Sequence, residues 1–186
     1  MFVIAVEKGT PVKGNEKEPE TYTTTNQLVI PIETVVVKEI NTESVPLYDV
    51  PLDKELQLYI VELCEKANIV PSLVIAIVER ESNFDPLSVG DNGNSLGLMQ
   101  IQPKWHQWRM DELGGGDWFN PYDNLKVGVH ILTDLFHRYG DDVYKVLMAY
   151  NGGISYTERM ADKGLYSDYA VEVAARAAEL EQEKLK

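Results

Sequence analysis

The spacing of apolar residues predicts a mainly helical protein from about residue 50 onward. Over long stretches these residues recur every three or four positions, which is the period of a helix with one buried face. Acidic residues or proline open several of these stretches, and glycine closes others. The helices expected on this basis cover residues 54–67, 71–81, 124–140 and 141–152, with a last one from about residue 167.

Polar and glycine-rich stretches between these helices predict loops. Residues 83–95 are rich in Gly, Asn, Asp and Pro, which favour turns. We expect a short helix or turn over residues 96–101, followed by a loop through the three glycines at 114–116.

The first 48 residues differ from the rest in composition. Residues 7–27 are polar and rich in Glu, Lys, Thr and Pro, and residues 26–40 are β-prone without a clear partner strand. We therefore predict a linker or stalk over residues 1–48, largely extended or disordered, and a helical domain over residues 49–186. The apolar patch at the N-terminus is too short for a signal peptide and no basic residue precedes it, so no export signal is readable.

Charge and cysteine content narrow the classes of function. The chain has 17 Lys and Arg residues against 30 Asp and Glu, a net charge of -13. This balance argues against a nucleic-acid partner, because such binding rests largely on neutralising phosphates. Cys64 is the only cysteine, which excludes an intramolecular disulfide and a cysteine metal cluster. Its helical spacing predicts a buried core residue.

Glu81 stands at the end of an apolar stripe on the second expected helix. At about 100° per residue, it lies close in angle to Val74, Ile77 and Val78. A carboxyl group in this position should be partly desolvated, which raises its pKa and suits it to general acid catalysis near neutral pH. The alternative is a structural ion pair with Arg80 or a contact with a neighbouring loop.

Several short motifs follow this helix. They are ESNF at 81–84, GLMQIQP at 97–103, NPYDN at 120–124, MAYNGG at 148–153 and YSDYAVEV at 166–173. Each is weak alone, since NGG ends many helices and apolar residues fill many cores. Taken together, their order and spacing resemble those of the motifs in the catalytic domain of soluble lytic transglycosylases. This lysozyme-like family cleaves the glycan strands of peptidoglycan. The resemblance covers roughly residues 52–175 and implies a mainly α, lysozyme-like catalytic domain.

The resemblance also implies a catalytic residue and a substrate-binding segment. The family's single catalytic acid and base falls on Glu81. The segment that lines the glycan cleft in that family falls on Gly97, Leu98, Met99 and Gln100. On this basis Gly97 permits close approach of the backbone, Met99 offers a soft apolar contact, and Gln100 offers a hydrogen-bonding amide.

Two further motifs of the resemblance contribute polar and aromatic residues. Tyr150 and Asn151 match an Ala-Tyr-Asn motif whose tyrosine lies near the catalytic glutamate and whose asparagine helps to hold sugar. Tyr169 matches a tyrosine of the family's final helix. For both tyrosines, plain helix packing is the alternative to substrate contact.

The chemistry of the family needs only one carboxylate. Inverting and retaining hydrolases both use a second carboxylate, as base or as nucleophile. A lytic transglycosylase, as the resemblance implies, uses the C6 hydroxyl of the N-acetylmuramic acid residue instead. Glu81 would protonate the departing glycosidic oxygen and then deprotonate that hydroxyl, which closes on C1 as a 1,6-anhydro ring. No metal or organic cofactor enters this reaction, and none is expected.

The loop before GLMQ keeps a rival hypothesis open. It is one residue longer than is usual for lytic transglycosylases and resembles goose-type lysozymes, which are hydrolases with additional aspartates. Asp91 matches the first of these and is included among the substrate-site residues, but Gln102 stands in place of the second. Hydrolysis is therefore disfavoured, and Asp91 has an alternative role as a turn residue. An inactive glycan-binding domain is the third hypothesis, which the presence of Glu81 opposes.

The remaining candidates leave the hypothesis of a peptidoglycan enzyme unchanged. Trp105, Trp108, Trp118 and Tyr122 suit either sugar contact or cover of the core. The three histidines lack zinc-ligand spacing, and residues 91–102 fail the EF-hand pattern, so no metal is expected. We expect peptidoglycan as the partner, outside the cytoplasm, in a secreted or membrane-anchored full-length form. A secretion, conjugation or phage machine is a candidate partner that delivers the enzyme.

Overall fold

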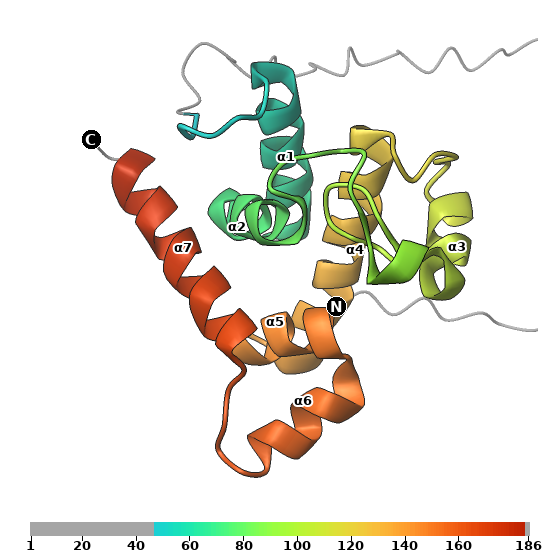
Figure 1. Ribbon diagram of the computed structural model, residues 1–186. Coiled ribbons are helices and arrows are strands. Elements are labelled where there is room, and N and C mark those ends of the chain that lie inside the picture. Colours follow the sequence, from blue (N-terminus) through green and yellow to red (C-terminus); the bar gives the residue numbers. More distant parts are fainter. Residues whose placement is uncertain (1–46, 185–186) are drawn as a thin grey trace, which may run out of the picture. The chain divides into compact units, whose positions relative to one another are not determined.

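The computed structural model describes residues 47–184, which are mostly helical (Figure 1). The helices are α1 (Lys54–Ala67), α2 (Pro71–Ser82), α3 (Pro103–Glu112), α4 (Pro121–Tyr139), α5 (Val143–Gly152), α6 (Ile154–Ala161) and α7 (Asp168–Lys184). Two short antiparallel strands, β1 (Val89–Gly90) and β2 (Ser95–Leu96), flank the 3-10 turn η1 (Asp91–Gly93). The predicted mainly α class is confirmed, and the β-prone residues 26–40 lie outside the described part of the chain.

The first two helices begin and end as their sequence predicts. The Asp53 carboxylate accepts a hydrogen bond from the backbone N–H of Leu56 at 2.7 Å, which caps α1. Asn68 ends α1 in the left-handed conformation, and Pro71 starts α2, where a missing N–H costs nothing. Cys64 is fully buried in α1, as predicted, and burial raises the pKa of its thiol to about 12.

Two helices were missed by the sequence prediction. Helix α3 occupies part of the expected loop. Only its Met110 is buried, so the helix has no apolar face whose spacing could predict it. Helix α6 starts directly after Gly152 and Gly153. These glycines end α5 as predicted, but Gly153 has φ 80° and redirects the chain into a new helix. Residues 96–101 form a turn closed by a bridge between Leu96 and Ile101.

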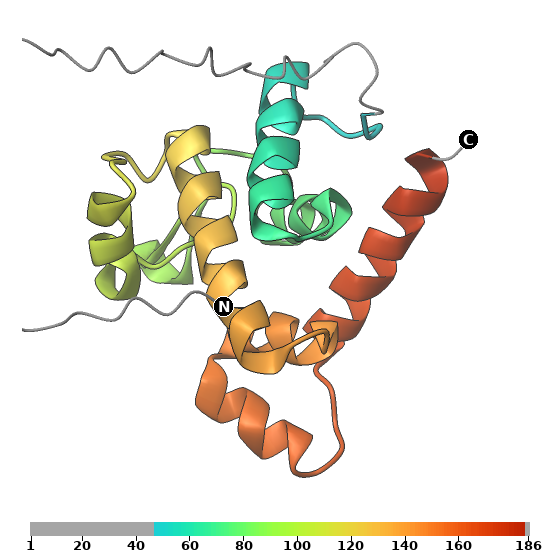
Figure 2. The ribbon, with the colours of Figure 1, turned by 180° about the vertical axis from the view of Figure 1, so that it is seen from behind.

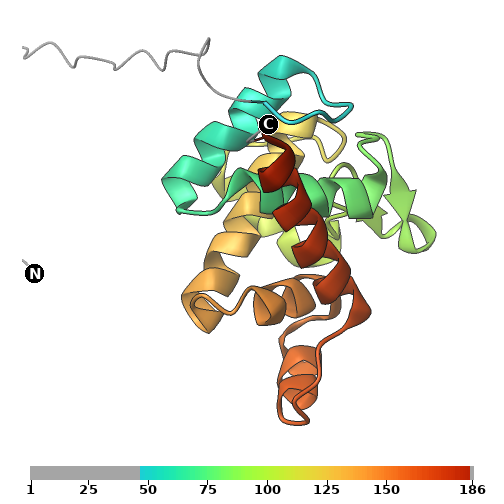
Figure 3. The ribbon, with the colours of Figure 1, turned by 90° about the vertical axis from the view of Figure 1, so that its left-hand side faces the viewer.

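Helix α2 lies at the centre of the described fold. All of its residues from Ser72 to Val78 are buried. Helix α1 packs against α2 and α4, and α7 crosses α2 on another side (Figures 1 and 3). Helix α5 contacts both α4 and α7. Helix α3 lies on the far side of α4 from α7, as both front and back views show (Figures 1 and 2). No helix within residues 47–184 is long and apolar enough to span a bilayer.

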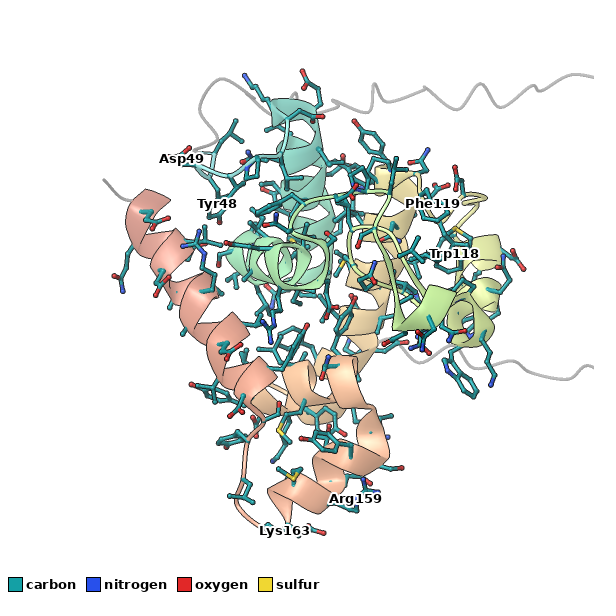
Figure 4. All side chains as sticks on the ribbon, in the orientation of Figure 1. Tyr48, Asp49, Trp118, Phe119, Arg159 and Lys163 are labelled. Atoms are coloured by element: carbon teal, nitrogen blue, oxygen red, sulfur yellow. The ribbon has the colours of Figure 1, made fainter. Side chains whose placement is uncertain are left out.

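Tyr48 belongs to the core of this fold. It is 6% exposed, although the boundary expected from composition places it in the N-terminal segment. Its backbone N–H donates to the Gln57 side chain at 2.9 Å, and its hydroxyl donates to Glu181 at 2.6 Å. Tyr48 therefore joins the start of α1 to the end of α7, close to the exposed Asp49 (Figure 4). Residues 47–52 have no helical periodicity, so the sequence pattern gave no sign that Tyr48 is buried.

Replacing Tyr48 with alanine should destabilise the domain by about 3 kcal/mol, the usual cost of removing a buried aromatic ring. The midpoint of urea unfolding measures this change. Asp49→Ala is the matched control: because Asp49 is exposed, this substitution should change the free energy of unfolding by less than about 0.5 kcal/mol. Equal midpoints for the two variants would mean that Tyr48 does not contribute to the core.

Candidate functional site

Glu81 lies in the last turn of α2, where three other parts of the chain approach it. The helix ends because Asn83 and Phe84 both adopt left-handed backbone angles, with φ 49° and 67°. The Glu81 side chain is half-buried, and its Oε1 accepts a 2.6 Å hydrogen bond from the hydroxyl of Tyr169 on α7. Tyr169 is 9% exposed, so this contact is shielded from water.

The environment of Glu81 favours its protonated form. Burial raises the pKa of this carboxyl above its ordinary value. The hydrogen bond from Tyr169 and the charge of Arg80 lower the pKa, and the negative charge of Asp91 raises it, but burial is the largest effect. The direction expected from the apolar stripe of α2 is confirmed. A raised pKa suits this carboxyl group to general acid catalysis better than an exposed glutamate.

Glu79 and Arg80, the two residues before Glu81, are held by α7. Glu79 accepts a 2.8 Å hydrogen bond from Nε of Arg176, and Arg80 lies 3.2 Å from a carboxylate oxygen of Glu172. These ion pairs line a surface hollow of about 310 Å³ between α2 and α7, which Glu81 does not line. Both pairs link α2 to α7, the helix that carries Tyr169.

Gly97 and Asn124 fix the loop that follows β2. Gly97 has φ 76°, and a side chain there would collide with the amide of Asn124 and the carbonyl of Trp118. The fully buried Asn124 amide donates to Leu96 O and Trp118 O, both at 2.9 Å, and accepts from Met99 N at 2.8 Å. Our sequence reasoning did not assign Asn124 a role, although it ends the NPYDN motif. The available signal was its spacing, which places this polar residue on the same face of α4 as Val127, Gly128 and Ile131.

The other residues of the GLMQ segment mainly support this loop. Leu98 and Met99 are fully buried, and Met99 packs closely against Gly128 of α4. Their side chains therefore offer no surface to a ligand in this conformation. The Gln100 amide donates to Ser88 O at 3.1 Å and to Gly97 O at 2.9 Å, so both of its N–H groups are used within the loop.

Tyr150 and Asn151 of α5 lie in different surroundings. The Tyr150 hydroxyl donates to Met99 O at 2.7 Å, which ties α5 to the loop, and burial raises the pKa of this hydroxyl. The negative charge of Glu81 raises the pKa of Tyr150 further, so the two side chains are near each other. Asn151 is exposed, and its amide makes no hydrogen bond within residues 47–184, which leaves it available to a ligand.

Asp91 is anchored inside its own loop. Its Oδ2 accepts hydrogen bonds from Ser95 Oγ at 2.7 Å and from Gln102 Nε2 at 3.1 Å. Its backbone is left-handed, with φ 48°, and its carbonyl accepts from the Asn94 amide. Asp91 is exposed, and its negative charge is close enough to Glu81 to raise the pKa of that carboxyl. Within residues 47–184, no group of three or more His, Cys, Asp or Glu lies close enough together to hold a metal ion.

Comparison with known proteins finds a matching family and several similar proteins. The family described as "Transglycosylase SLT domain" matches residues 59–165. The chain is 32% identical over 130 residues to "Lysozyme g" of Gallus gallus, covering 61% of this chain and 58% of that protein. It is 35% identical over 86 residues to "Transglycosylase" of Enterobacteria phage PRD1, covering 46% of this chain and 30% of that protein.

A third relative is "Membrane-bound lytic murein transglycosylase C" of Serratia proteamaculans, 29% identical over 140 residues, or 63% of this chain and 37% of that protein. The chain thus spans less than two thirds of the length of these three relatives. Two solved structures resemble the fold with a TM-score of 0.52, a lytic transglycosylase of Pseudomonas aeruginosa and the 70 kDa soluble lytic transglycosylase of Escherichia coli. They are 19% and 20% identical, cover 69% and 68% of this chain and 22% of each of those chains, and show a shared lysozyme-like fold.

Proposed function

The chain belongs to the transglycosylase SLT domain family, and on that premise we propose that it is a peptidoglycan lytic transglycosylase. The proposal gives Glu81 the roles of general acid and then general base on the linkage between N-acetylmuramic acid and N-acetylglucosamine. The observation that supports it most is the half-buried Glu81 carboxyl, whose pKa is raised by burial and which Tyr169 holds in one orientation.

The reaction proceeds in two proton transfers at one carboxyl group. Protonated Glu81 donates its proton to the glycosidic oxygen as the bond between that oxygen and C1 breaks. The resulting carboxylate then takes the proton of the C6 hydroxyl, whose oxygen bonds to C1 and closes the 1,6-anhydro ring. Glu81 ends protonated, as it began, and no water is consumed.

Tyr169 assists at the stage when Glu81 is charged. Its hydroxyl donates to Oε1 and stabilises the carboxylate between the two transfers, since a hydrogen bond to the charged form favours that form. We propose that the exposed Asn151 amide holds sugar hydroxyl or acetamido groups. Gly97 and Gln100 are proposed to contact the substrate through the loop backbone that they fix.

Tyr169→Phe should move the falling, alkaline limb of the pH profile of kcat/KM to higher pH. Activity starts from protonated Glu81, so it falls as the pH rises through the pKa of that carboxyl. Loss of the Tyr169 hydroxyl removes an interaction that lowers this pKa, and the pKa therefore rises further. Tyr150→Phe is the matched control, because that hydroxyl donates to Met99 O instead. A limb that moves to lower pH in Tyr169→Phe would contradict this role.

A goose-type hydrolase is the second candidate function. The 32% identity to "Lysozyme g" and the position of Asp91 favour it. Against it, both hydrogen bonds on Asp91 Oδ2 come from the loop itself, and one of them comes from Gln102, where a second aspartate would stand. These contacts suit a loop anchor better than a base that activates water.

Asp91→Asn distinguishes the two chemistries. For the lyase we expect a loss of activity below about tenfold, because the change alters only the anchoring of the loop. For a hydrolase, removal of the general base should cost roughly 10²- to 10⁴-fold. Mass spectrometry of digested peptidoglycan reads the product, since an anhydro end is lighter than a hydrolysed end by one water. Reducing muramic acid ends from the unchanged protein, together with an inactive Asp91→Asn, would establish the hydrolase instead.

The place of action is proposed from the same family. Relatives named as membrane-bound lytic murein transglycosylases support a role outside the cytoplasm, where peptidoglycan lies. Delivery by a secretion, conjugation or phage machine stays a prediction, as does the role of residues 1–46, which lie outside the described structure.

A further inference from the structure

Two tryptophans of α3 lie open to solvent. Trp105 is 60% exposed and Trp108 is 53% exposed. They are three positions apart, so both lie on one side of the helix. Large aromatic side chains exposed together lose the free energy that burial would give them, and such patches mark binding surfaces. The rings therefore point to a ligand that covers them.

Helix α3 is anchored mainly by residues other than these rings. Met110 is fully buried against the core. Arg109 places one nitrogen 2.7 Å from an Asp134 carboxylate oxygen and 2.7 Å from His130 Nδ1, both on α4. Because other residues anchor the helix, Trp105 and Trp108 form a fixed platform that needs no rearrangement to receive a ligand.

A positively charged side chain lies beside each ring. The Lys104 ammonium lies 4.6 Å from the centroid of the Trp105 ring, and the Arg109 guanidinium lies 4.3 Å from that of Trp108. The chain as a whole has a net charge of -13, which repels an anionic polymer. Arg109 is neutralised by Asp134, whereas the Lys104 ammonium has no ion pair with a described residue and is available to an anion.

We infer that Trp105, Trp108 and Lys104, here called the tryptophan surface, bind the glycan strands of peptidoglycan at a place separate from Glu81. The C–H faces of pyranose rings and the methyl groups of acetamido substituents suit an exposed indole face. Carboxylates of the peptide stems suit Lys104. The choice of ligand rests on the proposed function. Helix α3 lies on the far side of α4 from α7, the helix that contacts Glu81 through Tyr169, so the tryptophan surface is a second point of contact (Figures 1 and 2).

The test measures retention of the full chain on purified cell-wall sacculi, with Glu81→Gln in every protein so that nothing is digested. Trp105→Ala with Trp108→Ala should weaken retention by roughly tenfold and lower the melting temperature only slightly, because both rings are more than half exposed. Trp105→Phe with Trp108→Phe should restore much of the binding. Lys104→Gln should weaken binding to sacculi but not to chitin, which has no peptide carboxylates.

Tyr144→Ala with Tyr166→Ala provides the matched control. The ring centroids of these tyrosines are 4.8 Å apart and the residues are 39% and 49% exposed, so the control removes another exposed aromatic pair elsewhere on the surface. Equal retention on sacculi with and without the two tryptophans overturns the inference. It is also overturned if removing the tryptophans weakens binding to anionic lipid vesicles but not to sacculi. Failure of the proposed function would appear separately, as the absence of anhydro ends in digests by the unchanged protein.

Discussion

Glu81→Gln should abolish glycan cleavage while leaving the fold intact. The amide keeps the size of the carboxyl group and can still accept the hydrogen bond from Tyr169, but it cannot donate the proton that the leaving oxygen needs. Because one carboxyl serves as both acid and base in this proposal, the loss should be about 10³-fold or more. Release of soluble fragments from peptidoglycan measures the rate, and circular dichroism with thermal melting checks the fold.

Glu79→Gln is the matched control for this prediction. Glu79 lies two positions earlier on α2 and is half-exposed, paired with Arg176. Breaking such a pair costs under about 1 kcal/mol, so activity should stay within a few fold of the unchanged protein. Equal losses in the two variants would show that Glu81 is not the acid, and substantial turnover by well-folded Glu81→Gln would remove the mechanism.

The difference between these two glutamates was readable from the sequence. Helical geometry places Glu81 over the apolar stripe that includes Ile77 and Val78, and both of those residues are fully buried. The same geometry left Glu79 on a less apolar side, where the structure shows its ion pair with Arg176. Because burial of a helix face depends on the spacing of nearby residues, the direction of the Glu81 pKa shift could be predicted from the sequence of α2 alone.

Contacts between distant segments could not be predicted in this way. The hydroxyl of Tyr169 meets Glu81 across 88 positions of the chain, and that of Tyr150 meets Met99 O across 51. Spacing and composition cannot predict these contacts, because they depend on how α7 packs against α2 and on how α5 lies against the loop that contains Met99. Family resemblance identified both tyrosines, but only the structure shows that Tyr169 contacts the carboxylate and Tyr150 contacts the loop.

Helix α3 illustrates a second limit. Its residues lack an apolar period because the helix is anchored by Arg109 and Met110 and leaves Trp105 and Trp108 in solvent. Periodicity detects helices that bury a stripe, and this helix buries almost none. The segment with the weakest helical signal is therefore also the one whose exposed side chains are most available for binding.

Asn124→Ala should destabilise the protein by about 3 to 5 kcal/mol, the largest effect on stability that we expect. The change leaves Met99 N, Leu96 O and Trp118 O without their partner, and each unsatisfied group away from water costs about 1 to 3 kcal/mol. Urea unfolding measures the loss. Activity should fall as well, because the loop that lies beside Glu81 loses its attachment to α4.

Asn120→Ala and Asn124→Asp separate this role from simpler explanations. Asn120 is exposed and caps α4 through the N–H groups of Tyr122 and Asp123, so its loss should cost only about 1 kcal/mol. Asn124→Asp can still accept from Met99 N, but it places a buried carboxylate against the carbonyls of Leu96 and Trp118, so at neutral pH it should be at least as destabilising as Asn124→Ala. Hydrogen exchange at the Met99 amide should accelerate in both variants. Unchanged exchange in both would mean that Gly97 and Gln100 hold the loop, and that the hydrogen bonds of Asn124 do not stabilise it.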